Sequence, residues 1–477
     1  MVFSSATFLF LFLPLLLLLY FCRKSIRWRN AILLIFSLLF YAWGEPIWVL
    51  GMIVVTLINY VLALLIRKAR DPLPRKLLLT LAVIVSLSLL FWFKYSSFLF
   101  NSVSALFGSA VRLEDRHLPI GISFYTFQVL TYTIDVYRKK TKPQKNPFYA
   151  LLYISCFPQL IAGPIVQYAD IADELLERQT RPTDFLRGMQ RFVLGLAKKI
   201  LLANICGEML NATTLAGSGA ALSFFGAWMS ALLFSMQLYF DFSAYSDMAI
   251  GLGRIFGFHY KENFDHPYLS GSITEFWRRW HISLSSFFRD YVYIPLGGNR
   301  KGVARTILNL LIVWALTGLW HGASWNFVIW GLFYFVLLVT ERFVLKNTLG
   351  HIPAWIRHIF TLLLVSVGWV IFYYTDFSAM LTHLLAMIGI SNADGIHAAA
   401  LTDANLVLML KRYTVLPLLM MLFCLPLKDG LKRFFEKTKR RAFWGELLGA
   451  LALTAMFVLS LIFLLGQTYN PFIYFRF

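Results

Sequence analysis

Long runs of apolar residues, separated by short polar stretches, fill most of this chain. A membrane-spanning helix needs about 17–25 such residues in succession. The first run, from Phe3 to Phe21, is followed rather than preceded by basic residues, the reverse of a cleaved signal peptide, so we expect an uncleaved membrane helix. Further runs follow at Ala31–Trp43, Ile47–Ile66, Leu77–Phe93, Pro119–Val136, Phe148–Val166, Leu222–Phe240, Ile307–Trp320, Trp325–Val344, Ile359–Tyr374, Val407–Leu427 and Leu447–Leu465. They predict an all-α polytopic integral membrane protein with about eleven transmembrane helices.

Two regions do not have the pattern of simple spans. Residues 259–302 are dense in aromatic, histidine and charged residues, which would be left unsatisfied against lipid, so we expect them to line a cavity, pack within protein or lie at the surface. Phe185–Cys206 combines an apolar helical pattern with four cations, which is typical of an interfacial helix in the headgroup region. These cations are Arg187, Arg191, Lys198 and Lys199.

The formal net charge of +20 comes from basic clusters beside the apolar runs, a pattern typical of the cytoplasmic loops of membrane proteins rather than of nucleic-acid binding. If these clusters lie on the cytoplasmic side, the final helix runs toward the outer side of the membrane. The tail Gln467–Phe477 then lies at the outer face. The clusters are Arg23–Arg29, Arg67–Lys76, Arg138–Lys145 and Lys428–Arg441.

Composition supports a lipid environment, since 59% of the residues are hydrophobic and 14% are charged. No long polar stretch supplies a soluble domain, so we predict a single membrane domain over residues 1–477. The four cysteines, with no CxxC spacing among them, do not indicate a metal site, and we expect no bound metal or cofactor. The chain also lacks the GxSxG and Walker A patterns.

The most prominent candidate for chemistry is His321, at the junction of two apolar segments in LTGLWHGASWN (316–326). Ionisable residues inside a membrane are costly, and they are therefore functional hypotheses. A neutral imidazole takes a proton from a hydroxyl and returns one to a leaving thiolate. The competing interpretation is a structural histidine that is hydrogen-bonded to a carbonyl group.

A second candidate lies forty residues earlier, where WRRWHISLS (277–285) contains His281. Arg278 and Arg279 stand between two tryptophans, an arrangement that suits a phosphate or a carboxylate, although interfacial anchoring is an equally good interpretation. A third polar stretch, YFDFSAYSD (239–247), contains Asp241 and Asp247. We expect structural roles for these acids, either pairing with the arginines or capping a helix.

Several of these motifs resemble those of the membrane-bound O-acyltransferases, in particular the bacterial branch that contains the alginate O-acetylation proteins. The teichoic acid D-alanine exporters are more distant relatives. The resemblance covers nearly the whole chain. It rests on YAWGEP (41–46), PIGISFYTFQ (119–128), FPQLIAGPIVQY (157–168), YFDFSAYSDMAIGLGRIFGF (239–258), HPYLSGSITEFWRRWHISLSSFFRDYVYIPLGGNRKG (266–302) and LTGLWHGASWNFVIWG (316–331).

This resemblance implies a fold with re-entrant and interfacial helices around a central funnel or tunnel, and a catalytic core at about residues 119–345. The family's catalytic histidine falls on His321, and its second, variable polar position is placed on His281. The donor is expected to be cytoplasmic acetyl-CoA, a co-substrate rather than a bound cofactor. The acceptor is expected to be an extracellular or cell-envelope polysaccharide, reached through a separate extracytoplasmic acetyltransferase. A bacterial inner (cytoplasmic) membrane follows as the location.

Other residues receive roles from the same resemblance. An oxyanion donor is sought among Trp320, Trp325 and Asn326, through their side-chain N–H groups. Candidates for positioning the donor phosphates or polarising the thioester are Arg278, Arg279, Arg289 and Asn299.

The aromatic tail allows two interpretations. It suits an interfacial anchor. It also resembles the C-terminal aromatic motif of the small partner protein in teichoic acid D-alanylation, which implies that Tyr474 relays the acyl group outward; unlike that motif, this sequence ends in Phe477 rather than tyrosine. Two functional alternatives to acetyl transfer stay open: aminoacyl (D-alanyl) transfer to an envelope polymer, and a non-enzymatic role in transport or polysaccharide export.

Overall fold

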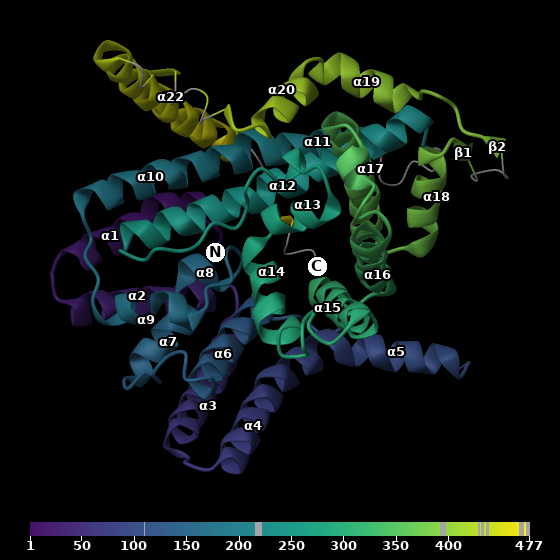
Figure 1. Cartoon of the computed structure of the whole chain (residues 1–477). Helices are drawn as coiled ribbons and strands as arrows, with labels where there is room; N and C mark the ends of the chain where they lie inside the picture. The colour runs from purple at the N-terminus through teal and green to yellow at the C-terminus, as the bar shows by residue number, and fades with distance from the viewer. Residues whose placement is uncertain are drawn as a thin grey trace. The chain divides into compact units, whose positions relative to one another are not determined.

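The computed structural model describes residues 1–108, 110–214, 222–391, 397–427, 430, 434–435, 438–466 and 472–473, and it is built almost entirely of helices (Figure 1). Within these residues, the strands β1 (Ile390–Ser391) and β2 (His397–Ala398) form one short antiparallel ladder, with Ile390 opposite Ala398. The predicted all-α class is confirmed.

Six helical segments in the described residues are long and apolar enough to cross a membrane, and a seventh is possible if the pair α19 (Ala404–Tyr413) and α20 (Leu416–Phe423), bent by 71°, is one broken span. The multi-pass character is confirmed, whereas the count of about eleven is not. The six segments are Trp48–Lys68, Pro72–Leu106, Val303–His321, Trp325–Val344, Ala354–Tyr373 and Arg441–Gly466.

Several of the predicted runs form helices that are short or buried within protein. Helix α6 (Ile122–Tyr137) is buried along nearly its whole length, polar residues included. The run Phe148–Val166 is interrupted at Cys156, between α7 (Pro147–Ser155) and α8 (Phe157–Leu160). An apolar run that packs against other helices has the same composition as one that faces lipid, and hydropathy alone does not separate them.

The residues group into two compact units, which we describe separately: unit 1 comprises 1–195 and 245–262, and unit 2 comprises 196–244 and 263–477. The predicted single domain stays a prediction. Helix α12 (Phe224–Ile255) contributes to both units. The other elements of unit 1 are η1 (Phe8–Phe12), α1 (Leu13–Phe21), α2 (Ile26–Ala42), α3 (Trp48–Lys68), α4 (Pro72–Leu90), η2 (Phe91–Tyr95), α5 (Ser96–Leu106), α6, α7, α8, α9 (Tyr168–Leu176) and α10 (Pro182–Ala197).

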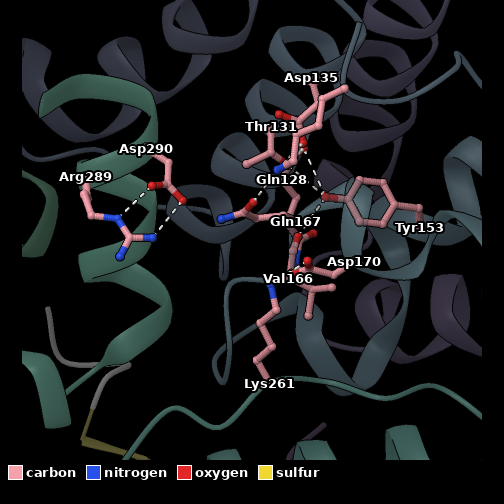
Figure 2. Close-up of polar contacts among 11 residues, drawn as sticks. Gln128, Thr131, Asp135, Tyr153, Val166, Gln167, Asp170, Lys261, Arg289 and Asp290 are labelled. Atoms are coloured by element: carbon pink, nitrogen blue, oxygen red, sulfur yellow. Dashed lines mark hydrogen bonds and ion pairs between the residues drawn. The ribbon is translucent and has the colours of Figure 1, made fainter. Parts of the chain in front are cut away.

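Buried polar side chains of α6 are satisfied by neighbouring segments of unit 1 (Figure 2). The Thr131 hydroxyl donates to the Gln128 carbonyl at 2.8 Å and lies 3.0 Å from the Tyr153 hydroxyl, which in turn donates to the Val166 carbonyl at 2.8 Å. Asp135 pairs with Lys140 at 3.5 Å. Such partners within protein offset part of the cost of burying a helix with this many polar residues.

The predicted interfacial segment Phe185–Cys206 forms α10 and then the π-helix η3 (Lys198–Ala203), and it continues into α11 (Asn204–Thr214). Arg187 is exposed, as an interfacial helix requires. Lys199 contradicts that interpretation, because it is only 2% exposed and pairs with Asp241. A buried lysine with a carboxylate partner belongs to the protein interior rather than to the headgroup region.

Unit 2 contains the remaining elements, and α15 (Val303–His321) and α16 (Trp325–Val339) lie against each other within it. Their backbones meet at two glycines: a Cβ on Gly318 would approach the Phe327 carbonyl to 2.3 Å, and one on Gly331 would approach the Trp314 carbonyl to 2.3 Å. Small residues at a helix crossing allow such contact between membrane helices. The remaining elements are η3, α11, η4 (Pro267–Leu269), α13 (Ile273–Arg279), α14 (Ile282–Phe288), η5 (Arg289–Tyr293), η6 (Thr340–Val344), η7 (Leu349–His351), α17 (Ala354–Tyr373), α18 (Phe377–Met387), β1, β2, α19, α20 and α22 (Lys439–Gly466).

Candidate active site

His321 is the last residue of α15 and is 7% exposed. Its imidazole lies among three aromatic rings, with ring centroids 4.9 Å from Trp320, 5.0 Å from Trp330 and 5.1 Å from Phe372, all in edge-to-face orientations. Helix α15 ends here because Gly322 adopts an extended conformation, and the chain then turns into α16. The glycine is needed at this point, since a Cβ would lie 2.0 Å from the Phe327 ring.

His281 is 1% exposed and precedes α14 in a left-handed backbone conformation, with φ of 45°. Such a φ is uncommon for a residue other than glycine, and it persists only where the surroundings hold it. Asn263 supplies these surroundings: its backbone carbonyl accepts from the Ile282 N–H at 2.9 Å, and its Oδ1 accepts from the Ser283 N–H at 3.2 Å. Sequence reasoning missed Asn263, which has no distinctive signal within its polar stretch.

The same asparagine fixes the tautomer of His281. Because Oδ1 of Asn263 accepts a backbone N–H, the atom facing Nδ1 of His281 at 3.2 Å is an oxygen, and Nδ1 must carry the proton. The lone pair is therefore on Nε2. In the described part of the chain this buried atom has no hydrogen-bond partner.

Burial also keeps the His281 ring neutral. Desolvation lowers the pKa of His281 from its usual value to about 3, because the charged form loses its hydration. At physiological pH the side chain is thus a neutral acceptor held in one orientation.

The three polar stretches singled out in the sequence meet in unit 2. Phe242 packs edge-to-face on His281, with ring centroids 4.6 Å apart. The Trp320 ring lies 5.9 Å from His281 and 4.9 Å from His321, so one indole contacts both histidines. Residues 239–244, 277–285 and 316–326 therefore supply one aromatic cluster with two imidazoles.

The residues proposed for donor binding occupy more open positions. Arg278 and Asn299 are exposed. Arg279 pairs with Glu275 at 3.0 Å, and Arg289 pairs with Asp290 at 2.8 Å (Figure 2). Their assignment to the donor phosphates stays a prediction.

Among the candidate oxyanion donors, the Asn326 amide already donates to the Tyr374 carbonyl at 2.7 Å, and Trp325 is 58% exposed. Trp320 stays in position beside both histidines. Trp330, which sequence reasoning missed, is fully buried against His321, and its indole N–H has no acceptor among the described residues. Its only sequence signal is its spacing of nine residues from His321.

The acids of the 239–247 stretch both form ion pairs, but not with Arg278 or Arg279. Asp241 pairs with Lys199 at 2.6 Å in unit 2, and Asp247 accepts from Arg191 at 2.9 Å in unit 1. Both acids thus form ion pairs, and the expected pairing with Arg278 and Arg279 is not found. Tyr474 lies outside the described residues.

Comparison with known proteins identifies the family of this chain. The family model of the membrane-bound O-acyltransferase family matches residues 35–392. The chain is 38% identical to the probable alginate O-acetylase AlgI of Pseudomonas putida, over 100% of both chains. It is 33% identical to the peptidoglycan O-acetyltransferase of Helicobacter pylori, over 83% of this chain and 81% of that one. A more distant relative is the teichoic acid D-alanyltransferase of Bacillus subtilis, 30% identical over 48% of this chain and 60% of that one.

The matched family region contains both histidines and the helices that hold them. With its long apolar helices and its match to acyl-transferring relatives, this chain belongs to the membrane-bound O-acyltransferase family and is a multi-pass membrane O-acyltransferase.

Proposed function

We propose that the protein transfers an acetyl group from cytoplasmic acetyl-CoA, across a bacterial cytoplasmic membrane, toward O-acetylation of an extracellular or cell-envelope polysaccharide. The observation that carries the proposal is the pair His321 and His281 on one indole ring, Trp320, within a buried aromatic cluster. Similarity over the full length to a probable alginate O-acetylase supports acetyl as the group transferred.

His321 is the general base in this mechanism. It takes the proton of the acceptor hydroxyl while the hydroxyl oxygen attacks the thioester carbonyl. The tetrahedral intermediate collapses with loss of the CoA thiolate, and the imidazolium returns its proton to that sulfur. The base is thereby regenerated, and the products are an ester and a free thiol. Proton transfer of this kind contributes roughly 10²–10⁴-fold to the rate.

His281 orients the substrate hydroxyl in this mechanism and does not take its proton. With its pKa lowered to about 3, the imidazole stays neutral and is a poor proton acceptor near pH 7. Its Nε2 lone pair is suited to accept a hydrogen bond from a substrate hydroxyl, and Asn263 holds that lone pair in one direction. A group fixed before the reaction costs little reorganisation when charge develops.

The Trp330 indole N–H is the best placed donor for the developing oxyanion. It is buried beside His321 and has no acceptor in the described residues. The surrounding rings exclude water, so a single N–H there acts more strongly than it would in solvent. Arg278, exposed at the end of α13, is assigned to the donor's phosphates.

The tail supports a relay step. The described residue Ile473, which directly precedes Tyr474, is buried and belongs to the same hydrophobic cluster as Trp277 and Trp330. In the proposed relay the Tyr474 hydroxyl is the first acceptor, and a separate extracytoplasmic acetyltransferase moves the acetyl group from it to the polysaccharide.

D-alanyl transfer is the second candidate, and the similarity to a teichoic acid D-alanyltransferase favours it. That similarity covers 48% of this chain, against 100% for the alginate relative. The shorter match makes acetyl the better supported group.

The test uses the purified full chain in lipid nanodiscs with radiolabelled acetyl-CoA. We expect release of free CoA and hydroxylamine-sensitive label on the protein or on an added polysaccharide acceptor. A parallel reaction with a D-alanyl thioester separates the two acyl groups. Absence of both thioester cleavage and label, with folded protein, would contradict acyl-CoA chemistry and favour transport or export.

A further inference from the structure

A buried ion pair of unit 2 lies outside the two-histidine cluster. Lys199 belongs to the π-helix η3, and Asp241 belongs to α12; Nζ and Oδ1 are 2.6 Å apart, and both side chains are 3% exposed. Single π-helical turns inside longer helices occur often at functional sites. Removing two charges from water is costly unless additional hydrogen bonds satisfy them.

The further contacts come from residues near the end of the sequence. The backbone N–H of Ile473 donates to Oδ2 of Asp241 at 2.6 Å, so both carboxylate oxygens are engaged. The ammonium of Lys199 lies 4.7 Å from the centroid of the Phe472 ring. Phe472 and Ile473 are 2% and 5% exposed. Ile473 thus contacts the anion, and the residue before it, Phe472, contacts the cation.

This arrangement has the chemistry of a peptide-binding site. A carboxylate that accepts a backbone N–H and a cation near an aromatic ring together select a peptide segment with an aromatic residue. A pair that only joined η3 to α12 would leave Oδ2 in need of another donor. Helix α22, which precedes the segment, contacts η3 and so brings the segment to the pair.

We propose that Lys199 and Asp241 form a docking site for the chain's own aromatic segment around Phe472–Ile473, and that this segment is an exchangeable occupant rather than a fixed part of the core. The docking rests on the contacts above and not on the acetyl-transfer proposal. Only its consequence, that Tyr474 is delivered to the reaction, rests on that proposal.

The first test uses the full chain in nanodiscs and hydrogen–deuterium exchange of its last peptides, with no activity measurement. The Ile473 amide should exchange roughly tenfold or more slowly than in a free peptide. An excess of a heavy-isotope peptide with the sequence of residues 467–477 should displace the segment and remove this protection. The same peptide with an N-methyl group on the Ile473 nitrogen lacks the N–H donor, so it should not displace the segment. Exchange at the free-peptide rate without competitor, failure of the unmethylated peptide to compete, or equal competition by both peptides would each overturn the proposal.

The second test changes the pair. Asp241→Asn and the double variant Lys199→Met with Asp241→Leu should both lose protection at Ile473; the double variant leaves no unpaired buried charge, so its fold is expected to persist. Asp247→Asn on the same helix is the matched control and should keep the protection. Full protection in a folded double variant would contradict the docking site, whatever the protein's acyl-transfer activity proves to be.

Discussion

His281 and His321 contact the same indole ring, that of Trp320, with ring centroids 5.9 and 4.9 Å away. The two imidazoles come from different helix ends, α14 and α15, and each is buried. Trp320 therefore fixes the spacing between a residue assigned to proton transfer and a residue assigned to orientation.

The pH dependence of stability tests the neutral state of His281. Because its folded pKa of about 3 lies below the unfolded value, the unfolded chain binds a proton first as the pH falls. The contribution of His281 to the free energy of unfolding is complete above pH 6.5. It is lost as the pH falls toward 3, at roughly 1.4 kcal/mol per pH unit. Asn263→Asp places a carboxylate against Nδ1, raises the pKa of His281 and should make the acid loss shallower. Melting temperatures between pH 7 and 4.5 measure this change.

The control for that experiment is the unaltered chain, whose melting temperatures are measured over the same pH range. An unchanged slope in Asn263→Asp would mean that Asn263 does not govern the protonation of His281.

The close crossing of α15 and α16 makes a second prediction. Gly318→Ala should separate the helices, since its Cβ would meet the Phe327 carbonyl at 2.3 Å, backbone that has little room to move. Overpacking of this kind costs about 1–3 kcal/mol or more, and displacement of α15 moves His321. We expect a lower melting temperature and a loss of acyl transfer.

Gly449→Ala on α22 is the matched control, because nothing lies within 4 Å of its added Cβ. It should be neutral or slightly stabilising, as alanine is favoured over glycine in a helix. Equal behaviour of the two variants would show that the crossing is not tightly packed.

The relay predicts a selective defect. Tyr474→Phe removes one hydroxyl and should abolish polysaccharide acetylation in cells while the protein level holds. Phe475→Tyr is a control that adds a hydroxyl one residue away and should not change acetylation. The readout is the acetyl content of the exopolysaccharide, and full acetylation in Tyr474→Phe would eliminate the relay.

Hydropathy predicted a helical membrane protein, and the motifs predicted the family, because both depend on local patterns. The span count is not confirmed: apolar runs such as α6 are buried within protein, and burial against helices and against lipid selects the same residues. The chemistry of His281 depends on Asn263, eighteen positions earlier, and the partner of Asp241 is a lysine on another helix. Such contacts are set by tertiary packing and leave no spacing signal in the sequence.

The role of His321 is tested most directly by the rate of CoA release from acetyl-CoA in nanodiscs, compared between the unaltered protein and His321→Ala with matched melting temperatures. We predict a fall of roughly 10²–10⁴-fold, the contribution expected of a general base. Release at the unaltered rate from folded His321→Ala protein would contradict it.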